Sequence, residues 1–402
     1  VTGLDGSRDL TKWGNGYLWV GGNNTSFTGN VSIEQGAIGV TSANAFVNAS
    51  TSITVKRYGV LDILTTGFTK ATAAVATSGS INYEAGSIER WSVDNARNGQ
   101  TVNLGAGTLQ VNADQNTAAG VTVILNGGSI EGFLRSDDVS SGNTGVVFRT
   151  LGTGVSFNLA GNSFIGQNAF TDGPNGTDNG RTTDLSTGVG ADTNSSSDLT
   201  GTARGAILEI KGNISGTGSL TKQSTDTVIL SGNNSYSGGT NIANGTLRLG
   251  SATALTTGTN LTTSSRGVLD LGGYNASIGN LNSSVITGAV FNSSSGFITN
   301  SATTANTLTV TPTADSTYDG VVQNNVNVTK GGTQKLIFAN VNTYIGATTV
   351  NGGTLEVQGG LSGTPAVAIN TGATLLLNSA SNNIVNTVAS MNIAGGSLKI
   401  DN

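Results

Sequence analysis

Side chains able to carry acid–base chemistry are scarce in this 402-residue chain, which contains no histidine and no cysteine. The absence of histidine removes the usual general base, the Ser-His-Asp triad and most catalytic zinc sites, and the absence of cysteine removes thiol chemistry. Carboxylate chemistry remains, and Asp137 with Asp138 forms the only adjacent acidic pair, next to Arg135. These three residues are the candidate active site for polysaccharide cleavage.

The acidic pair fits an ordinary solvated turn better than an active site. It resembles the paired aspartates of pectin hydrolases, but that family also needs a Gly-His-Gly segment, which this chain cannot supply. Calcium-dependent lyases use aspartates and an arginine base, and nothing beyond Arg135 follows their pattern. We therefore predict that the chain is not an enzyme and uses no cofactor.

A candidate metal site lies in the segment 166–205, which is rich in Asp, Asn, Gly, Ser and Thr and has almost no alternating apolar residues. Asp172, Asn175 and Asp178 would supply oxygen ligands of the kind that calcium prefers. Their spacing lacks the D-x-[DN]-x-[DN]-G pattern, and the chain has no G-G-x-G-x-D repeat. We predict a surface loop without a metal; a calcium or partner-binding loop is the alternative.

Tyr17 and Trp19 offer binding chemistry. Side chains two residues apart on a strand point to the same face. When the repeats below are aligned, Leu18 and Val20 face the core and the two aromatic residues face outward. Exposed aromatic rings stack on sugar rings or on another subunit. We predict a contact surface at Tyr17 and Trp19; packing under the segment 1–9 is the alternative.

A long repeat occurs three times and begins with a lysine in a Leu-Thr-Lys or Val-Thr-Lys strand. An aromatic residue follows the lysine after 14 residues in the two later copies and after 15 in the first. The pairs are Lys12 and Phe27, Lys222 and Tyr236, and Lys330 and Tyr344. We predict that the lysine is a solvated residue at the end of its strand.

A shorter unit recurs inside and between these copies: a glycine, one or two small residues, then a strand with alternating apolar positions. It occurs at Gly36, Gly59, Gly86, Gly107, Gly128, Gly245, Gly267, Gly353, Gly372 and Gly396. Its interval of about 20 to 27 residues is typical of one coil of a parallel β-helix. We predict an all-β, right-handed parallel β-helix of roughly 16 to 18 coils, about 80 Å long at the spacing of stacked strands. An array of β-sandwich domains is the alternative fold.

The coil pattern also predicts the domain organisation. N-terminal coils occupy 1–165, the extruded loop 166–205, and C-terminal coils continuous with the first 206–402. A net charge of −5 without a basic patch argues against a nucleic-acid partner. No run of 18 apolar residues predicts a membrane span. The chain begins at Val1 without a signal peptide, as a processed or trimmed piece would.

The long repeat resembles the autotransporter-associated β-strand repeat of passenger regions in bacterial type V secreted proteins. The second copy matches that pattern in order at Gly216, Gly218, Leu220, Lys222, Val228, Leu230, Gly232, Asn234, Tyr236, Gly238, Thr240, Ile242, Gly245 and Leu247. The middle glycines are replaced by 223–226 there, and the first copy has Phe27 in place of the tyrosine. The resemblance implies a β-helix exported to the bacterial cell surface, with a repeat that aids secretion and stability.

Three functions follow from these patterns. The first is an extracellular structural rod that associates with itself into a fibre or sheath, because neither end shows a capping element and an open strand edge accepts another strand. The second is an adhesin passenger that binds a host surface or glycan through the loop 166–205 and the aromatic pair. The third is the polysaccharide-active enzyme.

Overall fold

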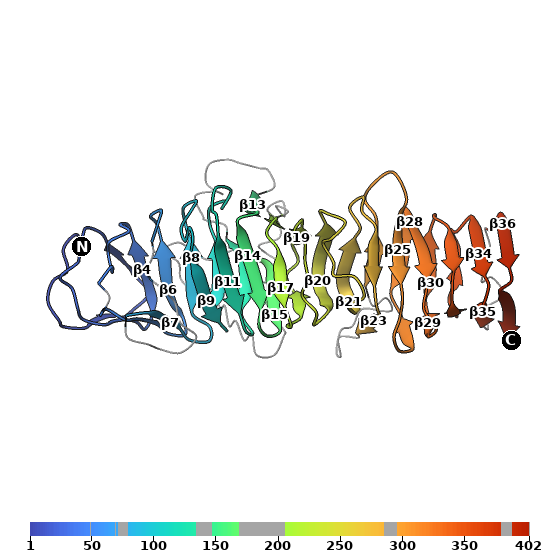
Figure 1. Ribbon diagram of the computed structural model, residues 1–402, viewed down its shortest axis with the longest axis horizontal. Helices are drawn as coiled ribbons and strands as arrows, with labels where there is room; N and C mark the ends of the chain where they lie inside the picture. The colour runs from blue at the N-terminus through green and yellow to red at the C-terminus, as the bar shows by residue number, and fades with distance from the viewer. Residues whose placement is uncertain are drawn as a thin grey trace, which may run out of the picture. The chain divides into compact units, whose positions relative to one another are not determined.

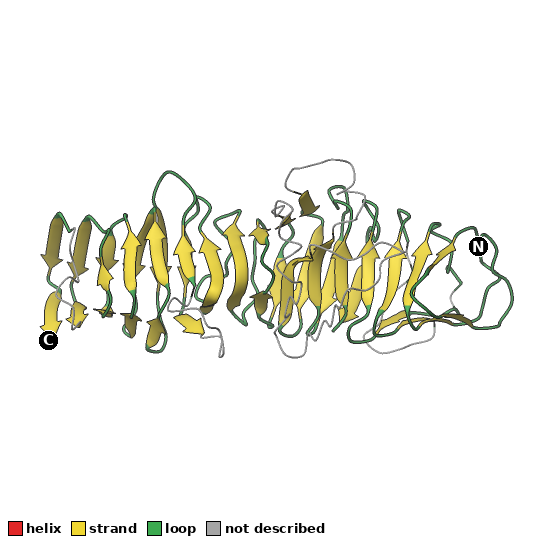
Figure 2. Cartoon of the chain, turned by 180° about the vertical axis from the view of Figure 1, so that it is seen from behind, coloured by secondary structure: helices red, strands yellow, loops and turns green. Residues whose placement is uncertain are grey.

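The computed structural model describes residues 1–48, 50–68, 70, 79–133, 147–168, 206–284, 296–378 and 388–401. Within these ranges every regular element is a β-strand and none is a helix (Figure 2). No helix in these ranges is therefore long and apolar enough to cross a membrane. Contacts divide the chain into two compact units, Val1–Gly218 with Asp226–Val228, and Ser219–Thr225 with Ile229–Asn402.

Parallel strands from successive coils lie side by side in the first unit (Figure 1). One sheet contains β1 (Leu10–Lys12), β3 (Val31–Ile33), β5 (Ile53–Val55) and β7 (Ile81–Tyr83). A second contains β9 (Thr101–Gly105), β11 (Val121–Leu125), β14 (Val155–Leu159) and β17 (Ile214–Gly216). The remaining strands are β2 (Tyr17–Val20), β4 (Gly36–Val40), β6 (Gly59–Ile63), β8 (Ile88–Trp91), β10 (Thr108–Val111), β12 (Ser129–Phe133), β13 (Val147–Leu151), β15 (Ser163–Asn168) and β16 (Ala206–Ile210).

The second unit uses the same principle, with up to three strands in each coil. One sheet contains β22 (Ala276–Ile278), β25 (Asn306–Val310), β28 (Val326–Lys330), β31 (Thr348–Val350), β34 (Ala366–Asn370) and β36 (Ser390–Ala394). Another contains β26 (Ser316–Tyr318), β29 (Lys335–Phe338), β32 (Gly353–Val357), β35 (Ala373–Asn378) and β37 (Ser397–Asp401). The other strands are β18 (Leu220–Lys222), β20 (Thr240–Leu249), β21 (Leu261–Asp270), β23 (Leu281–Ser284), β24 (Phe297–Thr299), β27 (Val321–Asn324), β30 (Val341–Tyr344) and β33 (Gly360–Leu361), and β19 (Thr227–Leu230) crosses the division between the units.

Stacking of identical positions builds the core. Because strands pair in parallel and in register, an inward residue lies above the inward residue of the next coil. Leu336 of β29 pairs with Leu355 of β32, which pairs with Leu375 of β35, and all three are fully buried. Such apolar ladders remove hydrocarbon from water along the coil interior and supply most of the folding free energy.

The sequence prediction of a parallel β-helix is confirmed, with about 15 turns instead of 16 to 18. A sandwich array would require antiparallel hairpins, whereas the named strands pair in parallel. The glycine-led units become β4, β6, β8, β10, β12, β20, β21, β32, β35 and β37. Strand β15 extends three residues into the predicted loop 166–205, and the rest of that loop, 169–205, lies outside the described residues.

Gly353, the first residue of β32, and Gly372, the residue before β35, differ in how closely the preceding coil approaches them. Gly353 and Gly372 both have positive φ, 58° and 76°. A Cβ on Gly353 would lie 2.5 Å from the Gln334 carbonyl oxygen and 2.6 Å from that of Thr333, whereas one on Gly372 would meet nothing within 4 Å. We expect Gly372→Ala to lower the free energy of unfolding by about 1 to 2 kcal/mol, the cost of a left-handed backbone. Gly353→Ala should lower it by more, because its turn must also move away from the preceding coil. Urea unfolding of both variants checks this, and equal losses would contradict it.

Candidate functional site

The three repeat lysines point into the coil interior. Lys12 is 8% exposed and Lys222 and Lys330 are 0% exposed, so the prediction of a solvated strand end was wrong. Lys330 occupies an inward ladder position between Val310 of β25 and Val350 of β31. The alternation along the strand places Lys222 and Lys330 on the same side as the buried Leu220 and Val328, two positions earlier.

Each ammonium group is surrounded by backbone carbonyl oxygens of the turns. Lys12 Nζ donates to the carbonyls of Trp13 (2.9 Å), Gly14 (2.5 Å) and Gln35 (3.2 Å). Lys330 Nζ donates to those of Gly331 (2.7 Å), Gly332 (3.3 Å) and Gly352 (3.1 Å). Lys222 Nζ donates to the carbonyl and hydroxyl of Ser224 and to the Asn244 carbonyl (3.2 Å).

One acceptor in every set comes from the next coil, 22 or 23 residues further along. We call this arrangement the lysine clamp. An ammonium group has three donors and no acceptor, so three carbonyls match it fully. Charge-assisted hydrogen bonds of this kind offset the cost of burying the cation. Burial lowers the pKa of Lys330 to about 8, with Asp315 acting in the opposite direction, so the group remains protonated at pH 7.

The repeat aromatic residue is also buried, and it pairs with the residue four positions later. The Tyr236 hydroxyl lies 2.7 Å from Thr240 Oγ1, and the Tyr344 hydroxyl lies 2.6 Å from Thr348 Oγ1. Burial raises the pKa of Tyr236 to about 12. In the first copy both hydroxyls are missing together: Phe27 and the residue four positions later, Val31, are buried as an apolar pair.

A buried asparagine near the aromatic residue of the repeat donates a hydrogen bond to a turn of the following coil. Asn234 Nδ2 donates to the Ala254 carbonyl at 2.7 Å, and Asn24 Nδ2 donates to the Ala45 carbonyl at 2.9 Å. Both acceptors belong to the following coil, 20 or 21 residues later. The polar residues of the repeat therefore hold backbone groups of its turns and are turned away from solvent.

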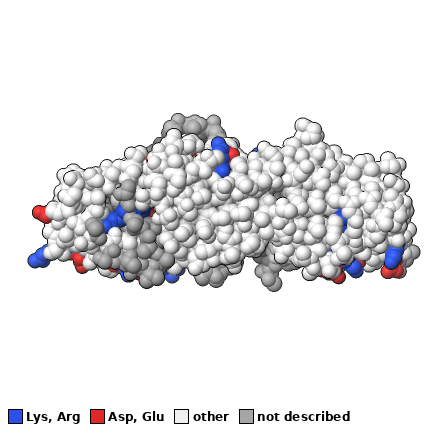
Figure 3. Space-filling model, in the orientation of Figure 1, with Lys and Arg blue, Asp and Glu red and all other residues white. Residues whose placement is uncertain are grey.

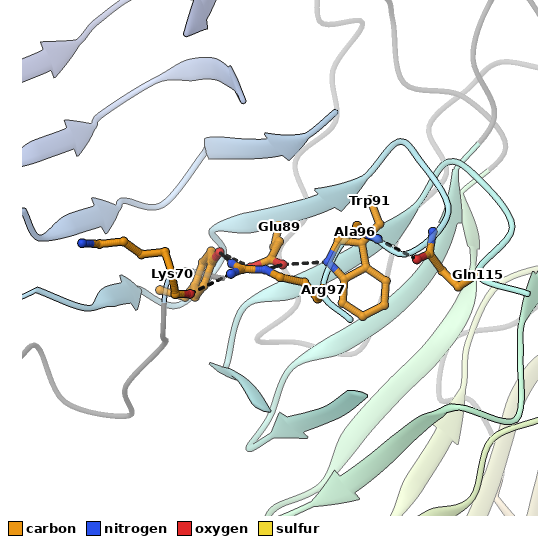
Figure 4. A network of polar contacts seen from close by, with 7 residues as sticks. Lys70, Glu89, Trp91, Ala96, Arg97 and Gln115 are labelled. Atoms are coloured by element: carbon orange, nitrogen blue, oxygen red, sulfur yellow. Dashed lines mark hydrogen bonds and ion pairs between the residues drawn. The ribbon is translucent and has the colours of Figure 1, made fainter. Parts of the chain in front are cut away.

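A buried ion pair occupies the first unit where the repeat is absent (Figure 4). Arg97 Nε and Nη2 donate to the two carboxylate oxygens of Glu89 at 2.7 and 2.8 Å, and its Nη1 donates to the Lys70 carbonyl at 2.7 Å. Glu89 also accepts from Trp91 Nε1 at 2.7 Å and from the Tyr83 hydroxyl. Both charged side chains are fully buried.

Glu89 takes a core position, since it pairs in register with Leu61 on one side and Leu109 on the other. The Arg97 guanidinium also lies over the ring of Phe68, with its carbon 4.8 Å from the ring centroid. A substrate has no access to a pair that is 0% exposed, so we assign the group a structural role. Sequence reasoning missed it, although Glu89 shares the inward side of its strand with Trp91.

The aromatic pair lies where the sequence predicted. Trp19 is 46% exposed, Tyr17 is partly buried, and their rings stack with centroids 4.9 Å apart and planes 23° from parallel. Val20 is fully buried on the opposite side of the strand, whereas Leu18 is only partly buried. Trp19 therefore faces outward, Leu18 is less buried than predicted, and a contact surface at Tyr17 and Trp19 remains a prediction.

Outward polar side chains continue from this pair across the neighbouring coils. The Tyr17 hydroxyl donates to Asp62 Oδ2 at 2.5 Å and accepts from Arg90 Nη1 at 2.9 Å. Arg90 Nε and Nη2 donate to Gln110 Oε1 at 3.0 and 2.8 Å, and Gln110 Nε2 donates to Glu131 at 3.4 Å. Asp62, Arg90, Gln110 and Glu131 pair in register, so they form one row along the sheet, and Gly39 and Trp19 continue this row.

Charged residues are sparse on the face of the molecule that Figure 3 displays, as expected from their 10% share of the sequence. Among the described residues, no group of three or more carboxylate side chains is placed to hold a metal ion. The candidate enzyme residues Arg135, Asp137 and Asp138 lie outside these ranges. The same is true of the metal candidates in the loop 169–205.

Four segments of the chain match the family model described as Passenger-associated-transport-repeat: 10–40, 104–131, 220–249 and 328–357. Three contain the lysine clamps. The segment 104–131 contains no lysine and no aromatic residue, which explains why the repeat was not recognised there from the sequence. Its glycine-led strands at Gly107 and Gly128 were the available signal.

The chain is also similar to the protein named Adhesin BmaC autotransporter of Brucella suis biovar 1 (strain 1330). The two are 35% identical over 154 residues, which is 37% of this chain and 4% of that protein. The chain therefore spans only a small fraction of the relative that it matches. No solved structure matches the chain.

The lysine clamp predicts a large difference between two lysines only five residues apart. We expect Lys330→Met to lower the free energy of unfolding by at least about 2 kcal/mol, because three turn carbonyls lose a charged donor. Lys335→Met is the control: the Lys335 ammonium is partly exposed and pairs with Glu356 at 2.8 Å, and Glu356 keeps Gln358 and Asn378 as donors when that pair is lost. A pair that water reaches contributes about 1 kcal/mol or less. Because the folded pKa of Lys330 lies below its ordinary 10.5, the unfolded chain binds more protons between pH 8 and 10.5. The destabilisation by Lys330→Met should therefore grow as pH rises through that window. Urea unfolding at pH 7, 8.5 and 9.5 measures both effects. Similar losses for the two variants would contradict the clamp, and a loss that shrinks with pH would contradict the lowered pKa of Lys330.

The natural apolar pair in the first copy predicts coupling between Tyr236 and Thr240. Tyr236→Phe and Thr240→Val each leave one buried hydroxyl without its partner, at a cost of about 1 to 3 kcal/mol. The double variant recreates the Phe and Val combination and should lose less than the sum of the single losses. A double-mutant cycle from urea unfolding gives the coupling energy. Additive losses would show that the two hydroxyls do not depend on each other.

Proposed function

We propose that this chain, four segments of which match the passenger-associated transport repeat model, is a non-enzymatic adhesin segment exported to the bacterial cell surface. The observation that carries the proposal is the direction of the repeat residues. Lysine, asparagine and tyrosine of the repeat bind backbone or partner groups inside the coils. The repeat thus builds the scaffold, and binding falls to side chains on the outward positions.

The similarity to the Brucella protein supports this reading. Its name describes an autotransporter adhesin, and the matched region covers 37% of the present chain. An adhesin needs a stable, extended display surface and no reaction centre. Stacked coils provide such a surface, because each coil adds outward positions at the strand spacing of about 4.8 Å.

The environment of the buried carboxylates supports a non-enzymatic role. Glu89 is bound to Arg97, Asp62 lies 3.7 Å from Arg90, and Glu356 accepts from Lys335. Each of these carboxylates is therefore held in place beside a cation. A general acid or base instead needs a lone pair or proton directed at a substrate.

Self-association into a fibre is a second candidate. The parallel, in-register pairing of strands between coils favours it, because the same type of pairing can join one copy to another.

Binding of the purified, fluorescently labelled chain to mammalian cell monolayers tests the adhesin proposal. We expect saturable binding that an excess of unlabelled chain displaces, with labelled serum albumin as the control. Binding no greater than that of albumin would overturn it. Negative-stain electron microscopy of the same preparation over a concentration series tests the second candidate: long filaments support fibre formation, and separate particles at every concentration contradict it.

A further inference from the structure

Trp19 has the surroundings of a binding platform. Of the three tryptophans, Trp91 is fully buried, Trp13 is 71% exposed in a turn, and Trp19 is 46% exposed on the outer side of β2. One side of the Trp19 ring system is covered by the stacked ring of Tyr17. The remaining exposed area is therefore a flat aromatic surface whose orientation is fixed.

A glycine in the next coil leaves the space that the Trp19 indole occupies. Gly39 of β4 pairs with Trp19 in register. A Cβ on Gly39 would lie 2.9 Å from Trp19 Cε3 and 2.8 Å from Leu64 Cδ1, closer than side chains tolerate. The indole thus lies against the backbone at Gly39, beside Leu64, in space that any other residue at this position would fill.

The fold does not require this arrangement, because the other lysine-bearing copies lack it. In the copies that begin at Lys222 and Lys330, the residues equivalent to Trp19 are Ile229 and Ile337. The residues equivalent to Gly39 are Arg248 and Glu356. Both are charged and form ion pairs, Arg248 with the buried Asp270 at 2.7 Å and the buried Glu356 with the partly exposed Lys335 at 2.8 Å. The same inner scaffold therefore carries an aromatic platform in one copy and ordinary ion pairs in the other two.

The row of polar residues beside Trp19 holds the Tyr17 hydroxyl, and the opposite charges of Asp62 and Arg90 in that row balance each other. The Tyr17 hydroxyl is held by Asp62 and Arg90, which lie 3.7 Å apart and neutralise each other. Burial is the main cause that raises the pKa of Tyr17, so it stays an uncharged hydroxyl over the physiological range. These residues position the platform, and they place no uncompensated charge beside it.

We propose that Trp19 binds an uncharged pyranose of a cell-surface glycan by stacking against its C–H face. An oriented tryptophan with an exposed ring face suits such a ring, because the sugar presents an apolar C–H surface on one side and hydroxyls at its rim. Because the Asp62 and Arg90 charges compensate each other, we expect this surface to prefer an uncharged sugar to a sialylated or sulfated one. This inference rests on the adhesin function proposed above and names its ligand class.

The test is direct binding of defined oligosaccharides to the purified chain, measured by biolayer interferometry. The uncharged probes are cellotetraose, chitotetraose and lacto-N-tetraose, and the charged probes are 3′-sialyllactose and a heparin tetrasaccharide. We expect at least one uncharged probe to bind, Trp19→Ala to weaken that binding at least tenfold, and Trp13→Ala to change it less than twofold. The proposal is overturned by no binding of the uncharged probes, by binding of the charged probes alone, or by equal binding to Trp19→Ala.

Further variants keep the test decisive if Trp19→Ala fails to fold. Trp19→Phe retains an aromatic face and should keep part of the affinity, whereas Trp19→Leu retains apolar bulk alone and should lose it. Equal affinities for these two variants would overturn stacking. Cell binding separates the two proposals: adhesion that persists in the Trp19 variants leaves the adhesin function standing with its site elsewhere, and glycan binding without adhesion leaves the platform standing.

Discussion

Backbone carbonyl groups that point into the coil are the constraint on which this structure depends. A parallel coil must turn between its strands, and a turn buries polar groups that no neighbouring strand can satisfy. In the lysine-bearing copies one ammonium group binds the carbonyls of its own turn and of the turn stacked on it. The close approach of these turns also explains the glycine of the following coil. At Gly36, with φ of 74°, a Cβ would lie 2.3 Å from the Gly14 carbonyl oxygen and 2.8 Å from Lys12 Nζ.

Charged groups in the core also restrict how the coils can stack. A ladder of valines and leucines tolerates a slip of two residues, because one apolar side chain replaces another of similar size. A lysine that must meet three carbonyls fits in one register. The Arg97 and Glu89 pair imposes a comparable condition in the first unit, with Glu89 inserted between Leu61 and Leu109. Buried ion pairs add little net stability compared with apolar residues, so we infer that these groups contribute specificity of stacking.

The coils could be predicted from the sequence, whereas the buried side chains that bind the turns of consecutive coils could not. Glycine-led alternation located β4 and β32, and it placed Leu336 in the core and Trp19 outside, because strand periodicity is a local property. The lysine clamp could not be anticipated in the same way. A lysine is expected in water, and the carbonyl cluster that makes its burial favourable exists only after two consecutive turns have folded on each other. Alternation alone would have placed Lys330 inside; the general preference of charge for solvent was the assumption that failed.

The Glu89 and Arg97 pair was not predicted for a related reason: the two residues are eight apart and meet only because the chain folds back after β8.

The inward and outward residues of the repeat have different roles. Because the inward residues bind the backbone of the turns, the outward residues are not needed to hold the coils together. The lysine-bearing copies illustrate this separation. Their inner lysines make the same type of contact, whereas their outer faces carry Trp19 on Gly39, an Arg248 ion pair, or a Glu356 ion pair. Because inward and outward residues alternate on one strand, an outer face can change without disturbing the clamp beneath it. A surface protein built in this way can acquire a new ligand by substitution at outward positions while its coils, and the turns that stack them, stay the same.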